Sequence, residues 1–382
     1  MIKKSISTIL MMICTSIILG QSIARVENIK IQSKKLKQER EIIVYTPIDY
    51  DWRKNEFFNV IYVFDSHSRE FFDYTSAIVS FLNTKSFIVV GITSPYNEKL
   101  DYSRNNDLLP ILKTKNSIDR FGKYSGNAEN FFNYVSKEII PYIDSHYRTL
   151  NSRIAVGHSL SASFILDSFI KNPNLFNNYI AISPNFAYDN NKLANKLVDF
   201  DYSKIDKTTY LYLSNANEGI KYWEEWKPAR NIVYKFFNQT LKNDNLKVQI
   251  NEFPENTHWN TFPPSLNKGL NFYFKRISDL QEKELSKEEY KVTIKIKVLN
   301  KNDTIYITGN QNNLGNWNPK KIKMERISDF EREIKLNLKS PAQFKITKGN
   351  WNSEAQIKGT YKAITIKPEK QSKFEFEIES YY

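Results

Sequence analysis

Residues 153–161 read RIAVGHSLS, a short apolar run that reaches Gly157 and Ser159 and is followed by a helical pattern. A serine at a sharp turn between a strand and a helix has an exposed hydroxyl, and the strained turn requires small neighbours. Ser161 stands where glycine is usual in this pattern, and serine is still small enough for close packing of helix on strand. The stretch therefore predicts an α/β fold in which Ser159 is the catalytic nucleophile.

The flanking sequence, from residue 26 to about 280, alternates short apolar runs with amphipathic stretches. Apolar residues recur at helical spacing within 130–147 and 231–241. Strands that alternate with helices indicate a mostly parallel sheet with helices on both faces. The predicted strands are 58–64, 87–92, 154–157, 179–183, 209–214 and 248–253.

A serine nucleophile needs a general base, which follows the last strand when the nucleophile lies on such a turn. His258 occurs in FPENTHWNTF, just after the last predicted strand, where a loop can bring the imidazole back to Ser159. We therefore predict His258 as the base, with His67 as the alternative. The other two histidines are interpreted as a neighbour of the nucleophile and as a helix end: His158 and His146.

The acid of a catalytic triad is expected in the loop after the strand that ends near residue 214. Glu218 is the only carboxylate in the segment NANEG that follows this strand. It would hold the tautomer of His258 and stabilise the imidazolium. Glu224 and Glu225 are the alternatives, although a solvated helix face is the simpler interpretation of both.

An oxyanion hole on such a site uses two backbone N–H groups. One is expected from Leu160, directly after the nucleophile. The other is expected from the loop after the strand 58–64, where Ser66 and His67 are both candidates.

The first 24 residues have the pattern of a secretory signal. Lys3 and Lys4 precede an apolar stretch at 9–19, and cleavage could follow Gly20 or Ala24. The only cysteine of the chain, Cys14, lies in this stretch, so the exported chain would have no disulfide, thiol nucleophile or cysteine metal site. We therefore expect export to the periplasm or beyond, and neither a cofactor nor a metal.

Composition limits the remaining classes of function. The chain has 382 residues, of which 41% are hydrophobic and 14% aromatic, so it can bury a sizeable core and is long enough for two domains. A mean hydropathy of −0.54, without a long apolar run after residue 25, excludes a polytopic membrane protein. The net charge of +13 invites a nucleic-acid partner. Export argues against that partner, and we interpret the charge as surface composition.

The pattern changes after a charged run at 280–291, which we interpret as a linker or a solvated helix end. Beyond it, apolar and polar residues alternate without intervening helices, which predicts a small antiparallel β-sandwich over 289–382 and a hydrolytic domain over 25–282. Trp317 and Trp351 lie at loop-like positions, where flat rings suit the faces of sugars. The alternative is that they cap the core of the sandwich. The predicted strands are 292–298, 304–308, 330–338, 344–347 and 374–378.

Several motifs in 30–277 resemble the esterase-D-like α/β-hydrolases, which include siderophore esterases. The matching segments, in order, are VIYVFD, VVGITS, SRNNDLLP, SKEIIPYIDSHYRT, VGHSLSASF, LFNNYIAISP and ENTHWNTFP. The resemblance implies an esterase with a Ser-His-acid triad. It also implies that Arg104 lines the substrate side.

The stretch GNQNNLGNWNP, with the later FKITKGNW, resembles the starch-binding carbohydrate-binding modules of family 20. The resemblance implies a glucan site in which Trp317 and Trp351 stack on sugars and Lys345 donates to a sugar hydroxyl.

Taken together, the sequence favours an exported serine esterase that its C-terminal module targets to a starch- or glycogen-like polysaccharide. Its substrate would be a small-molecule or glycan ester, and no integral membrane association is expected. A siderophore esterase and a non-catalytic glycan-binding protein on a hydrolase scaffold are the alternatives. A nucleic-acid or anion binder is supported only by the charge.

Overall fold

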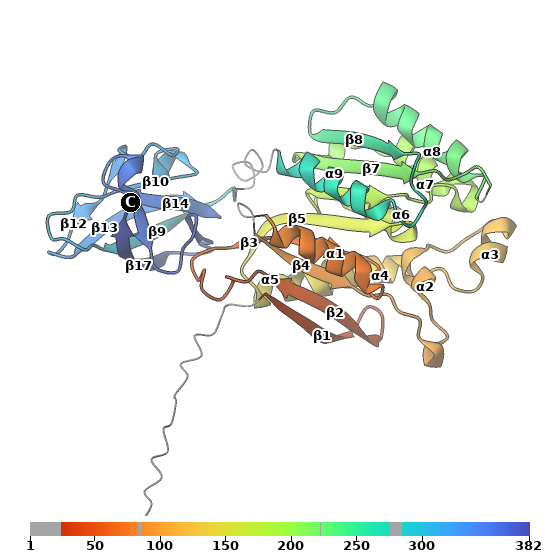
Figure 1. The fold of residues 1–382 in the computed structure, drawn as a ribbon, viewed down its shortest axis with the longest axis horizontal. Helices are drawn as coiled ribbons and strands as arrows, with labels where there is room; N and C mark the ends of the chain where they lie inside the picture. The colour runs from red at the N-terminus through yellow and green to blue at the C-terminus, as the bar shows by residue number, and fades with distance from the viewer. Residues whose placement is uncertain (1–23, 83–85, 222, 276–284) are drawn as a thin grey trace, which may run out of the picture.

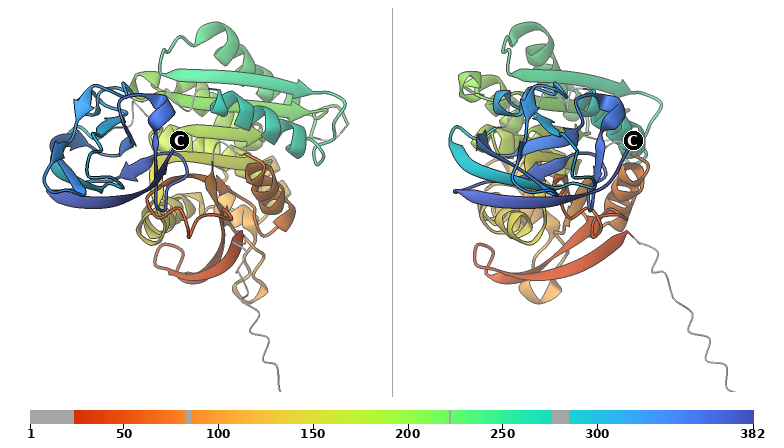
Figure 2. Two further views of the ribbon diagram at one scale, coloured as in Figure 1. Left: turned by 60° about the vertical axis from the view of Figure 1, so that its left-hand side comes forward. Right: turned by 90° about the vertical axis from the view of Figure 1, so that its left-hand side faces the viewer.

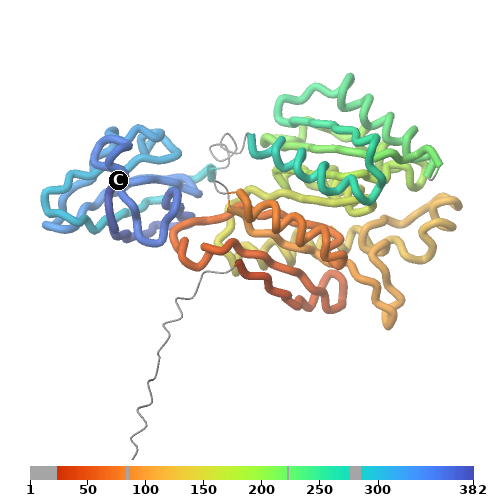
Figure 3. The backbone as a smooth tube through the Cα atoms, viewed as in Figure 1, coloured from red at the N-terminus to blue at the C-terminus, as the bar shows by residue number. Residues whose placement is uncertain are grey.

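The structure is a computed structural model that describes residues 24–82, 86–221, 223–275 and 285–382. The predicted signal segment lies outside these ranges except for Ala24. Two compact bodies lie side by side, a larger N-terminal one and a smaller C-terminal one (Figures 1 and 3).

An eight-stranded sheet forms the centre of the larger body, with the strand order β1-β2-β4-β3-β5-β6-β7-β8. Strands β3 to β8 are parallel, whereas β1 and β2 form an antiparallel hairpin that pairs with β4. Because parallel strands share one carboxyl edge, the loops after β3, β5, β7 and β8 meet there. The strands are β1 Arg25–Ser33, β2 Gln38–Thr46, β3 Phe58–Val63, β4 Phe87–Ile92, β5 Thr149–His158, β6 Asn178–Ile182, β7 Thr209–Ala216 and β8 Leu246–Phe253.

Helices cover both faces of this sheet (Figure 1). The helices α1 and α9 bury their apolar sides on one face, through Phe72 and Leu270 among others. On the other face, α4, α5, α6, α7 and α8 bury residues such as Phe131, Leu166 and Val233. The helices are α1 Arg69–Ser80, α2 Arg104–Leu108, α3 Lys115–Phe121, α4 Ala128–Tyr134, α5 Ile140–His146, α6 Leu160–Lys171, α7 Tyr188–Asp199, α8 Trp226–Lys235 and α9 Phe262–Phe274.

The predicted α/β fold is confirmed, and all six predicted strands are present within a few residues of the expected ends. The sequence analysis missed the hairpin of β1 and β2. Its first strand exposes one face to solvent and so lacks the continuous apolar run of the central strands. The helix predicted over 130–147 is divided into α4, a π-helical turn over 135–139 and α5.

The smaller body is a β-sandwich, which we call the C-terminal module. A four-stranded sheet, β11-β10-β14-β16, packs on a five-stranded sheet, β12-β13-β9-β17-β15, around an apolar core that includes Ile294 and Phe344. The pairs are antiparallel as predicted, with one exception: β17 runs parallel to β9. The strands are β9 Glu289–Lys297, β10 Tyr306–Gly309, β11 Ile322–Lys323, β12 Glu325–Arg326, β13 Glu331–Lys339, β14 Ala342–Thr347, β15 Ala355–Ile357, β16 Ile364–Ile366 and β17 Ser372–Tyr381.

Among the described residues, no helix combines the length and the apolar character needed to cross a membrane.

Candidate active site

Ser159 lies at the sharp turn between β5 and α6, with φ 60° and ψ −122°. Non-glycine residues rarely adopt a positive φ, and such strain is found at functional sites. The Ser159 N–H donates to the Ile182 carbonyl at 2.9 Å, which fixes the turn against β6. A Cβ on Gly157 would lie 2.6 Å from the backbone of Ser161, so only glycine fits there. The turn thus holds the Ser159 side chain at the carboxyl edge of the sheet.

His258 and Glu218 form a buried pair at the same edge, contributed by the loops after β8 and β7. His258 Nδ1 lies 2.5 Å from Glu218 Oε1, and the side chain of Glu218 is 2% exposed. Burial alone would raise the pKa of Glu218, but the hydrogen bond and charge of His258 outweigh it, with help from Arg230, and the pKa is lowered. Glu218 is therefore a carboxylate that can orient the imidazole and stabilise its protonated form.

The alternative residues do not form such a pair. His67 reaches the same region, but its buried Nδ1 has no hydrogen-bond partner among the described residues. Glu225 forms an exposed ion pair with Arg120, and Glu224 is exposed. His146 ends α5, where its Nδ1 lies 2.8 Å from the Tyr142 carbonyl.

A pocket of about 400 Å³ joins the predicted nucleophile and base. Ser159 and His258 both line it, with Arg104 on its wall. The sequence had already pointed to these three residues. It had also pointed to three more residues of the wall: His67, His158 and Leu160. It missed the rest of the wall: Asp65, Ser68, Phe71, Asn105, Arg120, Phe121, Asn185, Trp223, Trp226 and Trp259.

Two backbone N–H groups remain as candidates for an oxyanion hole. Leu160 is the first residue of α6, where the N–H groups have no acceptor within the helix. In the loop after β3, the His67 N–H has no acceptor within the described part of the chain. The prediction for Ser66 is wrong, because its N–H donates to the Ile92 carbonyl at 3.0 Å and its hydroxyl to the Val63 carbonyl at 2.8 Å.

Arg104 reaches the pocket through a two-point ion pair with Asp65. The Arg104 Nε lies 3.0 Å from Asp65 Oδ1 and its second nitrogen 2.8 Å from Oδ2. Burial alone would raise the pKa of Asp65, but the guanidinium outweighs it, and the pKa is lowered. The short helix α2 that carries Arg104 is itself fixed by a buried pair, in which Arg40 of β2 donates to Asp107 at 2.7 and 2.9 Å.

His158 fixes the backbone of the loop that carries the predicted base. Its Nε2 lies 2.7 Å from the His258 carbonyl oxygen, so this nitrogen donates. Burial, together with the nearby His258, lowers the pKa of His158 to about 4. The ring is therefore neutral at physiological pH and supports the loop without adding a charge to the pocket.

Three tryptophans surround His258. Trp223 and Trp226 stack on each other at 4.8 Å between ring centroids, and Trp259 is 70% exposed at the rim. Their ring centroids lie 5.2, 5.4 and 5.7 Å from that of His258. Sequence reasoning missed them because nothing in the local pattern around Trp223, Trp226 or Trp259 shows that their rings meet at His258. The one available signal was that three of the six tryptophans lie between the predicted acid and the final helix of this domain.

The residues predicted to bind glucan lie on neighbouring segments of the C-terminal module. The Trp317 N–H donates to the Gly309 carbonyl at the end of β10, and Trp351 begins the turn after β14. The two loops touch, because the Thr347 hydroxyl donates to the Pro319 carbonyl at 2.6 Å. Lys345 of β14 pairs with Thr308 in register, and its ammonium lies 2.7 Å from Glu354. Trp351 is 43% exposed, whereas Trp317 is half-buried.

No group of three His, Cys, Asp or Glu side chains in the described ranges is arranged to hold a metal ion.

The parallel sheet, the strained serine turn and the histidine–glutamate pair on the following loops define an α/β-hydrolase. The chain belongs to the Esterase family, whose model matches residues 33–272, and it carries a Starch binding domain over 289–380. Both resemblances that the sequence motifs suggested are thereby confirmed.

Individual proteins are similar to parts of this chain. The ferri-bacillibactin esterase BesA of Bacillus subtilis (strain 168) is 29% identical over 107 residues, which are 27% of this chain and 37% of that protein. An IroE-like serine hydrolase from Shewanella oneidensis shares the fold with a TM-score of 0.56 and 23% identity, over 66% of this chain and 80% of the other. The BES protein from Bacillus cereus has a TM-score of 0.53 and 22% identity, over 71% and 97%.

Proposed function

We propose that this protein is an exported serine esterase that hydrolyses a carboxylic ester through an acyl-enzyme. The single observation that carries the proposal is the convergence of Ser159, strained at the β5–α6 turn, with the buried His258–Glu218 pair on one pocket. Membership of the Esterase family agrees with it.

The mechanism follows from the chemistry of these groups. Ser159 attacks the ester carbonyl while His258 takes the hydroxyl proton, and the imidazolium then protonates the leaving alcohol. The N–H groups of Leu160 and His67 would stabilise the oxyanion. Water, deprotonated by His258, releases the acid and restores the serine. Glu218 remains ionised throughout and holds the imidazole.

A siderophore ester is the second candidate substrate. BesA is named as a ferri-bacillibactin esterase, and aromatic rings and two guanidinium groups line the pocket. Each guanidinium already has a carboxylate partner, Asp65 for Arg104 and Glu225 for Arg120. The pocket therefore has less positive charge to offer an anionic iron chelate than its two arginines suggest.

The C-terminal module is proposed to bind a starch- or glycogen-like glucan through Trp317 and Trp351. Lys345 is held by Glu354, but an ammonium has three donors, and the two others can donate to a sugar hydroxyl. Such binding would keep the enzyme at a polysaccharide surface. Export is inferred only from the pattern of residues 1–24.

Labelling and turnover test the esterase directly. The purified protein should react with a fluorophosphonate probe and hydrolyse p-nitrophenyl acetate, whereas Ser159→Ala should do neither, with a loss of about 10⁴-fold or more in kcat. Ser168→Ala is the matched control, because Ser168 is a buried serine farther along α6 whose hydroxyl donates to the Phe164 carbonyl. A wild-type protein that neither labels nor turns over would refute the enzyme and leave a glycan-binding protein on a hydrolase scaffold.

A further inference from the structure

The C-terminal module contacts the end of the sheet opposite the pocket. Residues 49–57 lead into β3 and therefore lie at its amino end. The side-chain amide of Asn55 donates to the Lys358 carbonyl at 2.8 Å, and the Asn55 carbonyl accepts from the Thr365 N–H at 2.8 Å. Lys358 and Thr365 belong to the module. In the view from the side of the module, the module lies in front of the amino ends of the strands of the hydrolase sheet (Figure 2, right).

Buried charges give this contact a defined geometry. The Glu56 carboxylate, in a residue only 6% exposed, accepts the backbone N–H groups of Tyr361 and Lys362. Arg53, 4% exposed, lies 4.5 Å from the centre of the Tyr361 ring. A buried charge is costly unless it is hydrogen-bonded. These contacts therefore hold the two domains in one orientation, because the buried Glu56 and Arg53 would lose these partners in any other.

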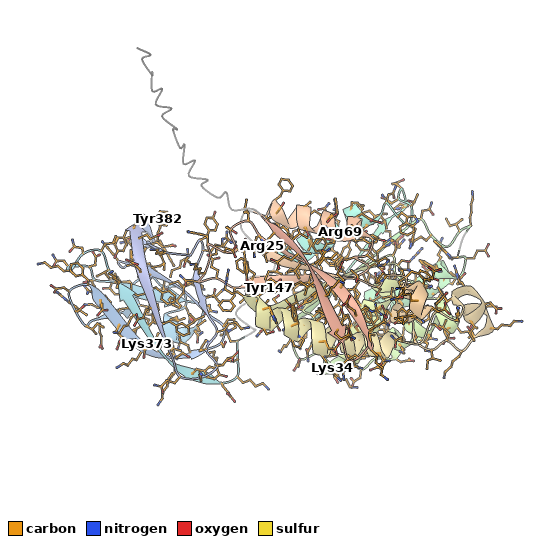
Figure 4. The ribbon with its side chains drawn as sticks, turned by 90° about the horizontal axis from the view of Figure 1, so that it is seen from below. Arg25, Lys34, Arg69, Tyr147, Lys373 and Tyr382 are labelled. Atoms are coloured by element: carbon orange, nitrogen blue, oxygen red, sulfur yellow. The ribbon has the colours of Figure 1, made fainter. Side chains whose placement is uncertain are left out.

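A third contact gives the distance to the nucleophile. Lys367 of the module donates to the carbonyl of Thr149, the first residue of β5, at 3.2 Å. Ser159 directly follows the last residue of the same strand. At a rise of about 3.3 Å per residue, ten residues place the two ends of β5 about 30 Å apart. Figure 4 shows the neighbouring Tyr147 at the end of the hydrolase domain that faces the module.

The proposed glucan side chains lie farther still from Ser159. Strand β16, which contains Thr365, is the edge strand on the hydrolase side, in the order β11-β10-β14-β16. Trp317 is bonded to the end of β10, which lies two strands, roughly 10 Å, from β16 within the sheet of the module. In Figure 1, α2 and α3, whose residues line the pocket, lie at the end of the molecule away from the module.

We infer that the ester cleaved at Ser159 is a small soluble ester, separate from the glucan segment that the module holds. The inference rests on the proposed esterase function. A short bound segment that stacks on Trp317 and Trp351 cannot also present an acyl group to a pocket on the opposite edge of the sheet. The module is thus an anchor that leaves the catalytic pocket open to solution, and the substrate arrives by diffusion.

The effect of added glycogen on the hydrolysis of two different esters tests this inference with the full-length protein. Hydrolysis of p-nitrophenyl acetate should keep its kcat/KM within about twofold when saturating glycogen is added, because a remote site contributes nothing to the transition state. Acetate release from acetylated starch should also be unaffected by excess unmodified glycogen. If glycogen lowers that release by about tenfold or more while p-nitrophenyl acetate is hydrolysed as before, the module delivers glucan esters to Ser159 and the inference is wrong.

Hydrogen exchange in the presence of maltoheptaose tests the placement without any catalysis. Protection should be confined to residues 310–321 and 348–354. Protection that extends to 157–161 or 254–260 would overturn the inference, and so would a protein with no protection anywhere, because the anchor would then be absent. Loss of ester hydrolysis with the expected protection pattern would instead refute the proposed esterase, so the two failures can be told apart.

Discussion

The carboxyl edge of the hydrolase sheet and the glucan face of the C-terminal module are built in different ways. The first brings together Ser159, Glu218 and His258 from three loops separated by up to 99 positions in the sequence. The second uses loops next to two paired strands, β10 and β14. A catalytic site needs groups of opposite chemistry at one point, so it depends on the whole fold, whereas a sugar platform needs only two exposed rings on a rigid surface.

Replacing the proposed triad acid should give the largest loss of activity in the first region. Glu218→Gln removes the charge that stabilises the His258 imidazolium while keeping the shape of the side chain, and kcat for p-nitrophenyl acetate should fall about 10³–10⁴-fold. Glu224→Gln, at an exposed position six residues on, is the control and should match wild type. Equal activity of Glu218→Gln and wild type would remove Glu218 from the triad.

Breaking the ion pair of Arg104 and Asp65 should destabilise the carboxyl edge of the hydrolase sheet. Arg104→Met leaves Asp65 buried without its partner, and the free energy of unfolding should fall by about 2–3 kcal/mol at neutral pH. In the wild type, the lowered pKa of Asp65 means that its stabilising contribution is complete at neutral pH and is lost below about pH 4.

In Arg104→Met, the guanidinium no longer offsets burial, which is the largest influence on the pKa of Asp65, so the charged form of Asp65 is less stable at neutral pH. The deficit should therefore narrow as the pH falls toward about 4.5, measured by urea unfolding. Arg69→Met, which breaks an exposed pair with Asp73, should cost no more than about 0.5 kcal/mol at either pH. A pH-independent deficit would contradict this account.

In the second region, single aromatic substitutions should weaken glucan binding by a smaller factor. Trp317→Ala and Trp351→Ala should each lower the affinity for maltoheptaose about 10- to 100-fold, the effect of losing one stacked ring. The measurement is calorimetric titration, with Phe330→Ala as a control at an exposed aromatic elsewhere in the module. Undiminished binding by both variants would mean that the rings cap the sandwich.

The smallest effect is expected from a substitution at the contact between the two domains. Asn55→Ala removes the side-chain bond to Lys358 and should destabilise the domain contact by about 1 kcal/mol. Scanning calorimetry should then show the two domains melting farther apart, while kcat/KM for p-nitrophenyl acetate stays at the wild-type value. Asn130→Ala, at an exposed position of α4, should leave the melting profile intact. A loss of catalysis in Asn55→Ala would show that the regions are coupled.

The sequence by itself determined the elements whose signals are local. The elbow at Gly157 and Ser159 could be read because strain at one turn demands small residues in a fixed spacing. The strands of the sheet are continuous apolar runs, and the module has two aromatic loops beside alternating strands. Glu218 and His258 followed from the order of the strands, since parallel strands bring successive loops to one edge.

Only the tertiary structure decided which backbone groups are free and what surrounds the pocket. Ser66 is removed from the oxyanion hole by a bond to Ile92, a residue 26 positions away that no local pattern reveals. Asp65, Arg120 and the tryptophans converge through folding alone. The position of the module is decided by Asn55, Glu56 and Thr149 at the amino edge of the sheet, and Thr149 lies about 30 Å from Ser159 along β5. Residues distant in sequence carry no mutual signal, and contacts between them exist only once the chain has folded.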